Sequence, residues 1–459
     1  MLDQSFSPEN FFRIFYHENR KGTFKRELLS NEYLEVHEEV KKLFNLRGSM
    51  TKEEFEEKRK ILNEEKRKAL EKYFEDLSIE CNKKSFQFKM KGFKRYGKTI
   101  WVVDSEPASF FAMKQLQYNV FKTFKVKQSN RFEIVKQLRI LLEDDFPKYL
   151  VRIDVKGFYE SIPQNILFKR IEENQLLNFQ SKKLLKQSIH CYEKMKDLMI
   201  NKPSHGVPRG VGVSAYLSEL YMREIDNRLK TMKDLVYYGR YVDDIVLVFI
   251  AESKSYLRDY YDEIQNIVKS DGLTLKDGID GGLDKTLKLD LFPTGISKEF
   301  DFLGYKFVIE NSKLKELRLS DNKLKKYEQR MKLTIEAYNL NSKFNEKKAR
   351  RLMINRFKFL TGNFHLINNK KRIKSGIYYS NVLMKYNDEK FGEFRHLDNL
   401  LKKSLSKLKA YDKLKVDLIK LKKRIIQRYS FNEGFYNRKN RFHAFDDSEL
   451  NEITTVWKD

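Results

Sequence analysis

The sequence predicts an α+β protein, because helical patterns occupy both ends of the chain and short strand patterns occupy its middle. Residues 1–80 have helical periodicity, and so does the region after Leu317, which contains no proline. Between residues 86 and 309, runs of β-branched and aromatic residues are separated by turn residues. We therefore expect two helical regions on either side of a mixed region that contains a sheet.

The first elements follow from local signals. Ser49 or Thr51 is predicted to cap a long helix that runs to about Leu77, because short hydroxyl side chains accept hydrogen bonds from the first turn of a helix. The next expected elements are a strand (Phe86–Phe93), a turn (96–98), a strand (Thr99–Val103) and a helix (Ala108–Phe124).

The middle of the chain alternates strands and helices. Residues 149–160 begin as a buried strand and end in a polar turn, and a helical pattern follows Pro163. An amphipathic helix is predicted over 213–230. Residues 235–250 have two β-rich flanks around Asp243 and Asp244, which predicts a hairpin with carboxylates at its tip. A second pair of strands is expected around Gly304.

Composition excludes several classes of protein. The 459 residues are 41% hydrophobic and include 35 Phe and 25 Tyr, which argues against wholesale disorder. No run approaches the ~18 apolar residues of a membrane span, and the first residues lack the pattern of a secretory signal. Two cysteines, Cys81 and Cys191, are too few for a disulfide framework or a four-cysteine zinc site, which indicates the cytosol.

The positive charge is concentrated in one region. The formal net charge is +27, of which residues 311–430 carry +22, residues 1–310 carry +7 and residues 431–459 carry −2. Within the basic region, Arg351–Lys374 mixes cations with aromatic residues. Because cations neutralise phosphates and rings stack on bases, we predict that this segment binds nucleic acid; a solvated helix face is the alternative.

Three carboxylates are expected at the ends of strands. Asp154 ends one strand, and Asp243 and Asp244 occupy the tip of the hairpin. Mg²⁺ prefers such oxygen ligands together with substrate phosphates, and two ions about 4 Å apart can hold the attacking and leaving oxygens of a phosphoryl transfer. An exposed acidic turn is the alternative, which the tightly framing apolar strands disfavour.

The hairpin sequence YVDD (Tyr241–Asp244) resembles the catalytic box of reverse transcriptases. The other boxes occur in the order that this family uses, over about residues 90–310. They are FKRYGKTIWVV (Phe93–Val103), RIDVKGFYESIP (Arg152–Pro163), HGVPRGVGVSAYLSELYMREID (His205–Asp226), GLTLKDGIDGGLDKT (Gly272–Thr286) and FDFLGYKF (Phe300–Phe307). Group II intron and bacterial members of the family provide the best match.

This resemblance implies a right-hand polymerase fold. Fingers and palm, the latter an RRM-like antiparallel sheet with helices, would occupy residues 81–310. A basic α-helical thumb would occupy residues 311–430. An N-terminal helical extension (1–80) and a C-terminal tail (431–459) would complete the chain.

The resemblance also implies catalytic roles. Asp154, Asp243 and Asp244 would be catalytic, and with the Val155 carbonyl they would hold two Mg²⁺ ions, for which Mn²⁺ is a possible substitute. Lys285 matches a lysine that protonates the pyrophosphate leaving group, which is a general-acid role.

Substrate contacts are implied in the same way. Tyr159 would be the steric gate against ribonucleotides, with Phe158 beside it. Arg209, where many relatives have Gln, and Gly210 would contact the nucleotide. The other residues implied to bind the triphosphate are Lys94, Arg95 and Lys98. The residues predicted to contact nucleic acid are Tyr241, Gly304, Tyr305, Arg351, Arg356, Lys358, Lys370, Lys371 and Arg372.

The first residues and the variant loop GVPRG are similar to bacterial antiphage reverse transcriptases of the "unknown group", particularly the smaller enzyme of the type 3 systems. This implies a cytoplasmic bacterial enzyme that makes single-stranded cDNA from a noncoding RNA template, using dNTPs and a DNA primer or product. It also implies a companion reverse transcriptase, with a homo- or hetero-oligomer possible and no membrane partner.

The alternatives are an RNA-dependent RNA polymerase, which the ring of Tyr159 disfavours, and a non-catalytic nucleic-acid-binding scaffold, which the three aspartates disfavour. Mobility is a further alternative, which the lack of an endonuclease signature disfavours. The primer is left open: an RNA 3′-hydroxyl, an oligonucleotide or a tyrosine.

Overall fold

The computed structural model describes residues 2–21, 24–95, 97–197, 205–251, 260–276, 286–368, 371–385, 392–409, 417–437 and 442–457. The chain divides into two compact units. Unit 1 contains Met1–Gln128, Asp154–Met232 and Tyr260–Asp277, and unit 2 contains Ser129–Ile153, Lys233–Asp259 and Gly278–Asp459. Within the described segments, no helix has the length and apolar character needed to cross a membrane.

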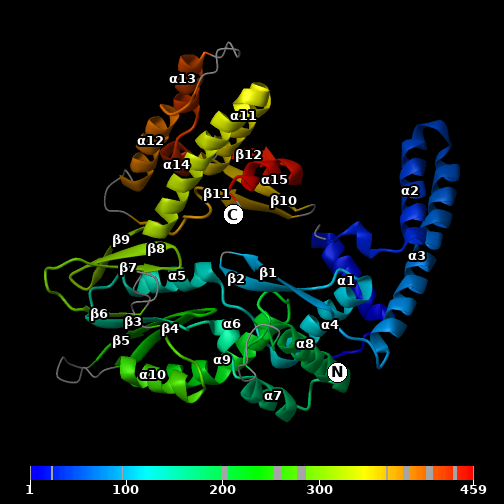
Figure 1. Ribbon diagram of the computed structural model, residues 1–459, viewed down its shortest axis with the longest axis horizontal. Helices are drawn as coiled ribbons and strands as arrows, with labels where there is room; N and C mark the ends of the chain where they lie inside the picture. Colours follow the sequence, from blue (N-terminus) through cyan, green and yellow to red (C-terminus); the bar gives the residue numbers. More distant parts are fainter. Residues whose placement is uncertain are drawn as a thin grey trace. The chain divides into compact units, whose positions relative to one another are not determined.

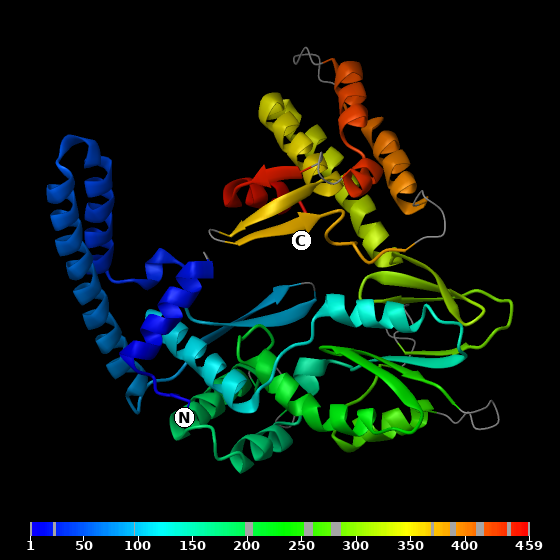
Figure 2. The same cartoon turned by 180° about the vertical axis from the view of Figure 1, so that it is seen from behind.

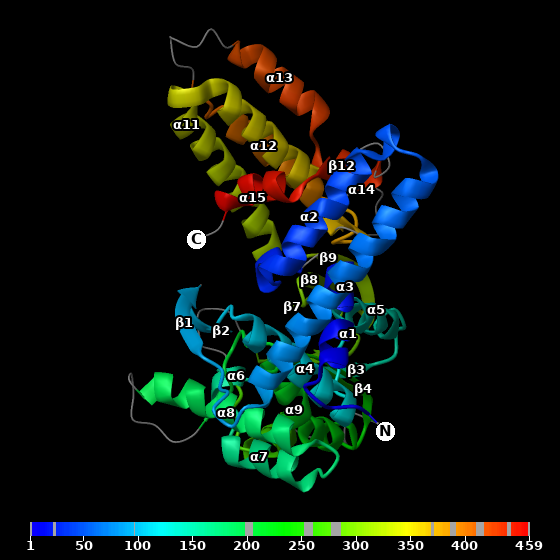
Figure 3. The same ribbon diagram turned by 90° about the vertical axis from the view of Figure 1, so that its right-hand side faces the viewer.

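Unit 1 begins with helices, as predicted. Its first three helices are α1 (Pro8–Lys21), α2 (Asn31–Asn45) and α3 (Lys52–Asn82), with short 3-10 turns at Arg26–Leu28 and Arg47–Ser49. Thr51 caps α3: its side chain accepts from the backbone N–H of Glu54, whose carboxylate accepts from the N–H of Thr51. This capping box satisfies two backbone donors that the helix start leaves without partners. Figure 3 shows α2 and α3 side by side.

Aromatic side chains hold these helices to α4 (Pro107–Phe124). Phe11 of α1, Phe74 of α3 and Phe111 of α4 are all fully buried. The Phe111 ring lies 5.0 Å from Phe74 and 5.4 Å from Phe11 between centroids, distances at which aromatic rings attract each other beyond the burial of their area. The three helices contact one another, and Figure 1 shows α1 and α4 beside α3.

The rest of unit 1 combines a hairpin with further helices. β1 (Met90–Arg95) and β2 (Lys98–Val103) pair antiparallel, so the first strand begins later than the predicted Phe86. The remaining helices are α6 (Phe158–Ser161), α7 (Gln164–Glu173), α8 (Phe179–Asp197), α9 (Ser214–Lys230) and α10 (Tyr260–Ser270). The predicted helices at 108–124 and 213–230 are confirmed as α4 and α9.

A four-stranded sheet underlies unit 2. Its strands are β3 (Lys148–Asp154), β4 (Leu235–Tyr241), β5 (Asp244–Phe249) and β6 (Leu287–Leu291), in the order β4-β5-β3-β6. β4 pairs antiparallel with β5, and β3 pairs antiparallel with β6. The predicted hairpin at 235–250 is confirmed, with Tyr241 opposite Asp244 at its tip. Helix α5 (Arg131–Leu141) precedes β3.

A second sheet leads into the helical part of unit 2. β7 (Lys298–Phe302), β8 (Tyr305–Glu310) and β9 (Lys313–Leu319) form an antiparallel sheet in this order. The long helix α11 (Asp321–Thr361) follows. It is kinked at Asn345, whose backbone leaves the helical region and whose side chain accepts from the N–H of Lys348, so that Asn345 caps the second half. The later helices are α12 (Gly392–Leu405), α13 (Leu418–Arg428), α14 (Phe431–Tyr436) and α15 (Asp447–Thr455).

The prediction of an all-helical region after Leu317 is wrong over residues 363–376. Asn363–Asn368 (β10) and Lys371–Gly376 (β11) pair antiparallel, and β12 (Phe442–Phe445) pairs parallel with β10 (Figure 2). Gly362 ends α11, and the alternating sequence NFHLIN after it suits a strand with one buried face. The residues predicted as a C-terminal tail thus contribute a strand to this sheet.

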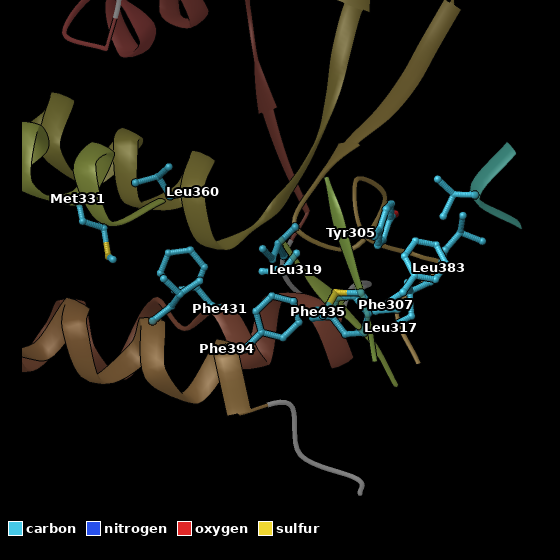
Figure 4. Close-up of a cluster of buried hydrophobic side chains, with 14 of the residues drawn as sticks. Tyr305, Phe307, Leu317, Leu319, Met331, Leu360, Leu383, Phe394, Phe431 and Phe435 are labelled. Carbon is cyan, nitrogen blue, oxygen red and sulfur yellow. The ribbon is translucent and has the colours of Figure 1, made fainter. Parts of the chain in front are cut away.

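One hydrophobic core joins the second sheet to the helices of unit 2. Figure 4 shows Phe307 and Leu317 of this sheet packed with Phe394 of α12 and Phe435 of α14. Phe300 and Phe307 stack at 4.7 Å between ring centroids. Phe357 of α11 is fully buried in the same core.

The start of α11 carries a lysine in an unusual environment. Lys323 Nζ donates to the carbonyl of Ser380 at 3.1 Å and lies 5.3 Å from the centre of the Tyr305 ring. Burial, together with the smaller effect of the nearby charge of Arg131, lowers the pKa of Lys323 to about 7.

We predict that Phe357→Ala destabilises unit 2 by about 3–5 kcal/mol, because truncating a buried phenylalanine loses burial and leaves a cavity. Phe344→Ala is the matched control, since Phe344 lies on the same helix with 85% of its surface exposed. Urea unfolding measures both. Equal effects of the two substitutions would contradict the placement of this core.

We also predict that the free energy of unfolding rises between pH 7.5 and 9 partly through Lys323. In this range the unfolded chain keeps a proton on this lysine, whose ordinary pKa is 10.5, whereas the folded chain has released it. Raising the pH therefore disfavours the unfolded state. Lys323→Met should flatten this rise and Lys325→Met, at an exposed position of the same helix, should not; parallel pH profiles for both variants and the wild type would contradict the assignment.

Candidate active site

The hairpin tip that carries Asp243 has a strained backbone. Only two residues, Val242 and Asp243, connect the paired Tyr241 and Asp244. Val242 has φ = +61°, a region that a β-branched residue rarely adopts. Such tight turns match the twist of a hairpin, and strain of this kind persists only where the surrounding structure enforces it. The sheet therefore holds Asp243 in a defined place at the end of β4 and β5.

An ion pair fixes the ends of two neighbouring strands against each other. Arg152 of β3 donates from Nε to Asp244 Oδ1 at 2.9 Å and from Nη2 to Asp244 Oδ2 at 3.0 Å. The pair is largely buried, with 13% and 17% of the two side chains exposed. A two-pronged contact of this kind fixes orientation as well as distance. It brings the last residues of β3 beside the first residue of β5.

Asp154 is the last residue of β3, two positions beyond Arg152. Since side chains alternate along a strand, Arg152 and Asp154 point to the same face of β3. Asp154 is 4% exposed, and its Oδ1 lies 2.5 Å from Nζ of Lys276. The neighbouring Val155 is fully buried and forms a β-bridge with Leu275. A buried carboxylate that holds a cationic group is suited to bind a metal ion in its place.

The chemistry of these oxygen donors fits Mg²⁺, a hard cation that binds one or two carboxylates and completes its shell with water and phosphate oxygens. Asp154, Asp243, Asp244 and the Val155 carbonyl supply only such donors. Within the segments that the structure describes, no three His, Cys, Asp or Glu side chains are grouped closely enough to hold a metal by themselves.

Arg209 is bound to Glu160 and lies over Tyr159. Its Nε and Nη2 donate to the two carboxylate oxygens of Glu160 at 2.8 and 2.9 Å. The guanidinium carbon lies 4.9 Å from the centre of the Tyr159 ring. This cation–π contact and the ion pair together hold Arg209 over Tyr159.

The loop that carries Arg209 is fastened to its surroundings by backbone hydrogen bonds. Val207 donates to the carbonyl of Tyr159 at 2.7 Å, and Trp101 of β2 donates to the carbonyl of Arg209 at 2.7 Å. Gly210 has φ = +100°, and a Cβ at this position would come within 2.7 Å of the Trp101 carbonyl. Gly210 therefore permits the close approach of the loop to β2. This packing explains the glycine without any contact to a nucleotide.

A cavity of about 500 Å³ opens beside Arg152 and Asp244. The β7–β8 hairpin and the first residues of α11 line it, including Asp301 and Lys306. Burial raises the pKa of the Asp301 carboxyl above its ordinary value, against the opposing effect of Lys306. Burial alone would lower the pKa of Lys306, but its hydrogen bond to Asp321 raises it above the ordinary value.

Three residues that were predicted to contact a nucleotide or nucleic acid are buried within the protein. Phe158 is 1% exposed, and Tyr305 is 5% exposed in the core of unit 2. Arg356 is also 5% exposed, and its guanidinium donates to the backbone carbonyls of Glu452 and Ile453. These positions argue against the predicted contact of each side chain with a nucleotide or nucleic acid.

The other predicted residues are more accessible. Lys94, Arg95 and Lys98 are exposed on the β1–β2 hairpin. Arg351 is exposed and forms an ion pair with Glu452 at 3.1 Å. Tyr241 and Lys358 are half-buried, and Gly304 forms the turn between β7 and β8. Lys371 and Arg372 belong to β11, and their backbones alone are described; Lys285 and Lys370 lie outside the described residues.

Three residues of the site were missed by the sequence analysis. Arg152 could have been found, because it alternates with Asp154 along one strand. Glu160 and Lys276 gave no signal, since their partners Arg209 and Asp154 are distant in the sequence.

A family model described as reverse transcriptase (RNA-dependent DNA polymerase) matches residues 52–307. Comparison with curated proteins gave no match. Among solved structures, telomerase from Candida albicans in complex with a TWJ fragment of telomeric RNA is similar at 14% identity, over 81% of this chain and 64% of that chain. Apo telomerase from Candida tropicalis is similar at 13% identity, over 81% and 60% of the two chains. The TM-scores, 0.33 and 0.36, are too low to support an argument about function.

Proposed function

We propose that this chain, which belongs to the reverse transcriptase (RNA-dependent DNA polymerase) family, copies an RNA template into DNA. The predicted enzyme class is confirmed at the level of the family, and so is the predicted α+β polymerase fold. This chain spans 64% of the length of the telomerase chain from Candida albicans. The template, primer and partners of this chain are therefore proposals as well.

The observation that carries the proposal is the ion pair between Arg152 and Asp244. It supports a site in which Asp154 and Asp243 are the metal ligands and Asp244 acts beside them. With both its oxygens bound by Arg152, Asp244 is better placed to orient the hairpin tip and the primer end than to be a primary ligand. The cavity beside Asp244 offers space for the primer end.

Two Mg²⁺ ions, when bound, would lower the pKa of the primer 3′-hydroxyl and neutralise charge on the departing pyrophosphate. Asp154, Asp243 and the Val155 carbonyl would hold them, and Asp244 would support the site from its ion pair with Arg152. Lys276 would then leave the Asp154 carboxylate, and its ammonium group would be available to triphosphate oxygens. Lys285 is the proposed proton donor to pyrophosphate.

Selection of deoxynucleotides is assigned to Tyr159. An aromatic ring at this position would clash with a 2′-hydroxyl group. Arg209 stacks on this ring while Glu160 holds it, which supports a role for Arg209 in keeping the ring in place. The exposed cations Lys94, Arg95 and Lys98 are proposed to bind the triphosphate.

Template and product binding are assigned to the basic region 311–430. Arg351, Lys358 and the β10–β11 hairpin, with Lys370, Lys371 and Arg372 at its turn, are the proposed contacts. The charge of +22 in this region supports the assignment, since each neutralised phosphate releases counterions and strengthens binding.

The biological role that we propose is antiphage defence in the bacterial cytoplasm. The GVPRG loop and the first residues support it through their similarity to antiphage reverse transcriptases. A noncoding RNA would serve as template, single-stranded cDNA would be the product, and a companion reverse transcriptase would be the protein partner.

We predict that the double variant Asp243→Asn, Asp244→Asn loses DNA synthesis by at least a hundredfold, because amides bind Mg²⁺ far more weakly than carboxylates. Primer extension on an RNA template measures synthesis, and plating of phage on cells that carry the native operon measures protection. Asp262→Asn, the same change at an exposed position of α10, is the control. Undiminished synthesis and protection in the double variant would contradict the proposal.

We predict that Tyr159→Ala increases incorporation of ribonucleotides relative to deoxynucleotides about tenfold or more, since the ring no longer excludes the 2′-hydroxyl. Tyr159→Phe keeps the ring and should keep the selectivity. Competition between dNTPs and rNTPs in primer extension measures the ratio. A wild-type enzyme that prefers rNTPs would instead favour an RNA polymerase.

A further inference from the structure

A second pocket, lined by basic and aromatic residues, lies in unit 1 between α1, α4 and the first turn of α9. Its volume is about 600 Å³, within the range of sites for small ligands. It is lined by four cationic side chains, one carboxylate and three half-buried aromatic rings. The cations are Arg13, Lys21, Lys114 and Lys122, the carboxylate is Glu18, and the rings are Tyr118, Phe121 and Tyr216.

The cations are held in place in two different ways. Lys21 and Lys114 form ion pairs with Glu18 at 2.9 and 3.0 Å. Burial alone would raise the pKa of Glu18, but the hydrogen bonds from both lysines lower it below the ordinary value. Glu18 therefore stays ionised and binds both ammonium groups, while the pocket retains an excess of positive charge.

The other two cations lie against aromatic faces. The guanidinium of Arg13 is 3.5 Å from the centre of the Tyr118 ring and also donates to the amide of Gln115 at 2.7 Å. Lys122 Nζ is 5.8 Å from the Tyr118 ring and 5.6 Å from the Phe121 ring. The ring of Phe121 lies 5.8 Å from that of Tyr216.

This combination matches the chemistry of a strand of nucleic acid. Bases stack on aromatic or guanidinium planes, and phosphates pair with the neighbouring lysines. An acidic peptide would pair with the lysines but would offer no planar bases to stack on this aromatic and guanidinium surface. The pocket also borders the segment 205–226, because Gln117 in its lining packs against Gly212 and Tyr216 belongs to α9.

We propose that this pocket binds one or two nucleotides of a single-stranded RNA. The proposal extends the proposed function by adding a binding site for RNA, and binding can be measured without DNA synthesis. Failure of the site and failure of the polymerase are therefore distinguishable.

The test uses the full chain and a ten-residue oligouridine that contains 4-thiouridine. We expect ultraviolet light to crosslink it to peptides that contain Tyr118, Phe121 or Tyr216, as mapped by mass spectrometry. Tyr118→Leu should weaken binding of the labelled oligonucleotide about tenfold in fluorescence anisotropy, because a stacked base contributes about 1–3 kcal/mol. Lys122→Gln should weaken it several-fold and reduce its dependence on salt, because one phosphate contact is lost.

Lys60→Gln is the matched control, since Lys60 is an exposed lysine of α3 outside the pocket lining, and it should bind as the wild type does. Lys122→Gln keeps the test valid if Tyr118→Leu fails to fold, which circular dichroism would reveal. The proposal is overturned if Lys122→Gln binds like Lys60→Gln and the crosslinks map elsewhere. It is also overturned if polyglutamate binds the pocket and the oligonucleotide does not.

Discussion

The pairing of β3 with β5 is the constraint on which the candidate active site depends. Arg152 and Asp244 lock the end of one strand to the start of the other, in an ion pair that is mostly shielded from water. Asp154 lies two residues after Arg152 and points to the same face of β3. Asp243 lies directly before Asp244, in a turn that begins with Val242, whose φ is positive. A shift of one residue in β3 would turn Arg152 and Asp154 to the opposite face of the strand and break the ion pair with Asp244. The register of β3 thus determines the face to which Asp154 points.

A second set of contacts governs the surroundings of Tyr159. The loop at 205–210 is fastened to β2 through Trp101 and to α6 through the carbonyl of Tyr159. Arg209 adds an ion pair with Glu160 and a cation–π contact with Tyr159. Three segments that are far apart in the sequence therefore support one another around this ring. In such an arrangement, a change in Glu160 or Arg209 would alter the position of the Tyr159 ring.

Much of this architecture could be predicted from the sequence, because it rests on local signals. Caps, turn residues and alternating hydrophobicity predicted the long α3 helix, the β4–β5 and β7–β8 hairpins of unit 2, and helices α4 and α9. The β10–β11 hairpin was missed because its alternation was short and lay within a region of helical periodicity. The burial of Phe158, Tyr305 and Arg356, and the partners Glu160 and Lys276, depend on tertiary contacts that no local pattern encodes. Motif spacing placed the carboxylates at strand ends, and the alternation of Arg152 with Asp154 was the local signal that could have identified the arginine that joins those ends.

We propose that Asp154 and the Asp243–Asp244 tip bind the same pair of metal ions. Cleavage of the backbone by hydroxyl radicals tests it directly, with Fe²⁺ bound in place of Mg²⁺ and supplied with ascorbate and peroxide. The account predicts cuts close to residue 154 and close to residue 243 in the same preparation, both suppressed by excess Mg²⁺. Cuts at only one of these segments, or cuts that Mg²⁺ does not suppress, would contradict it.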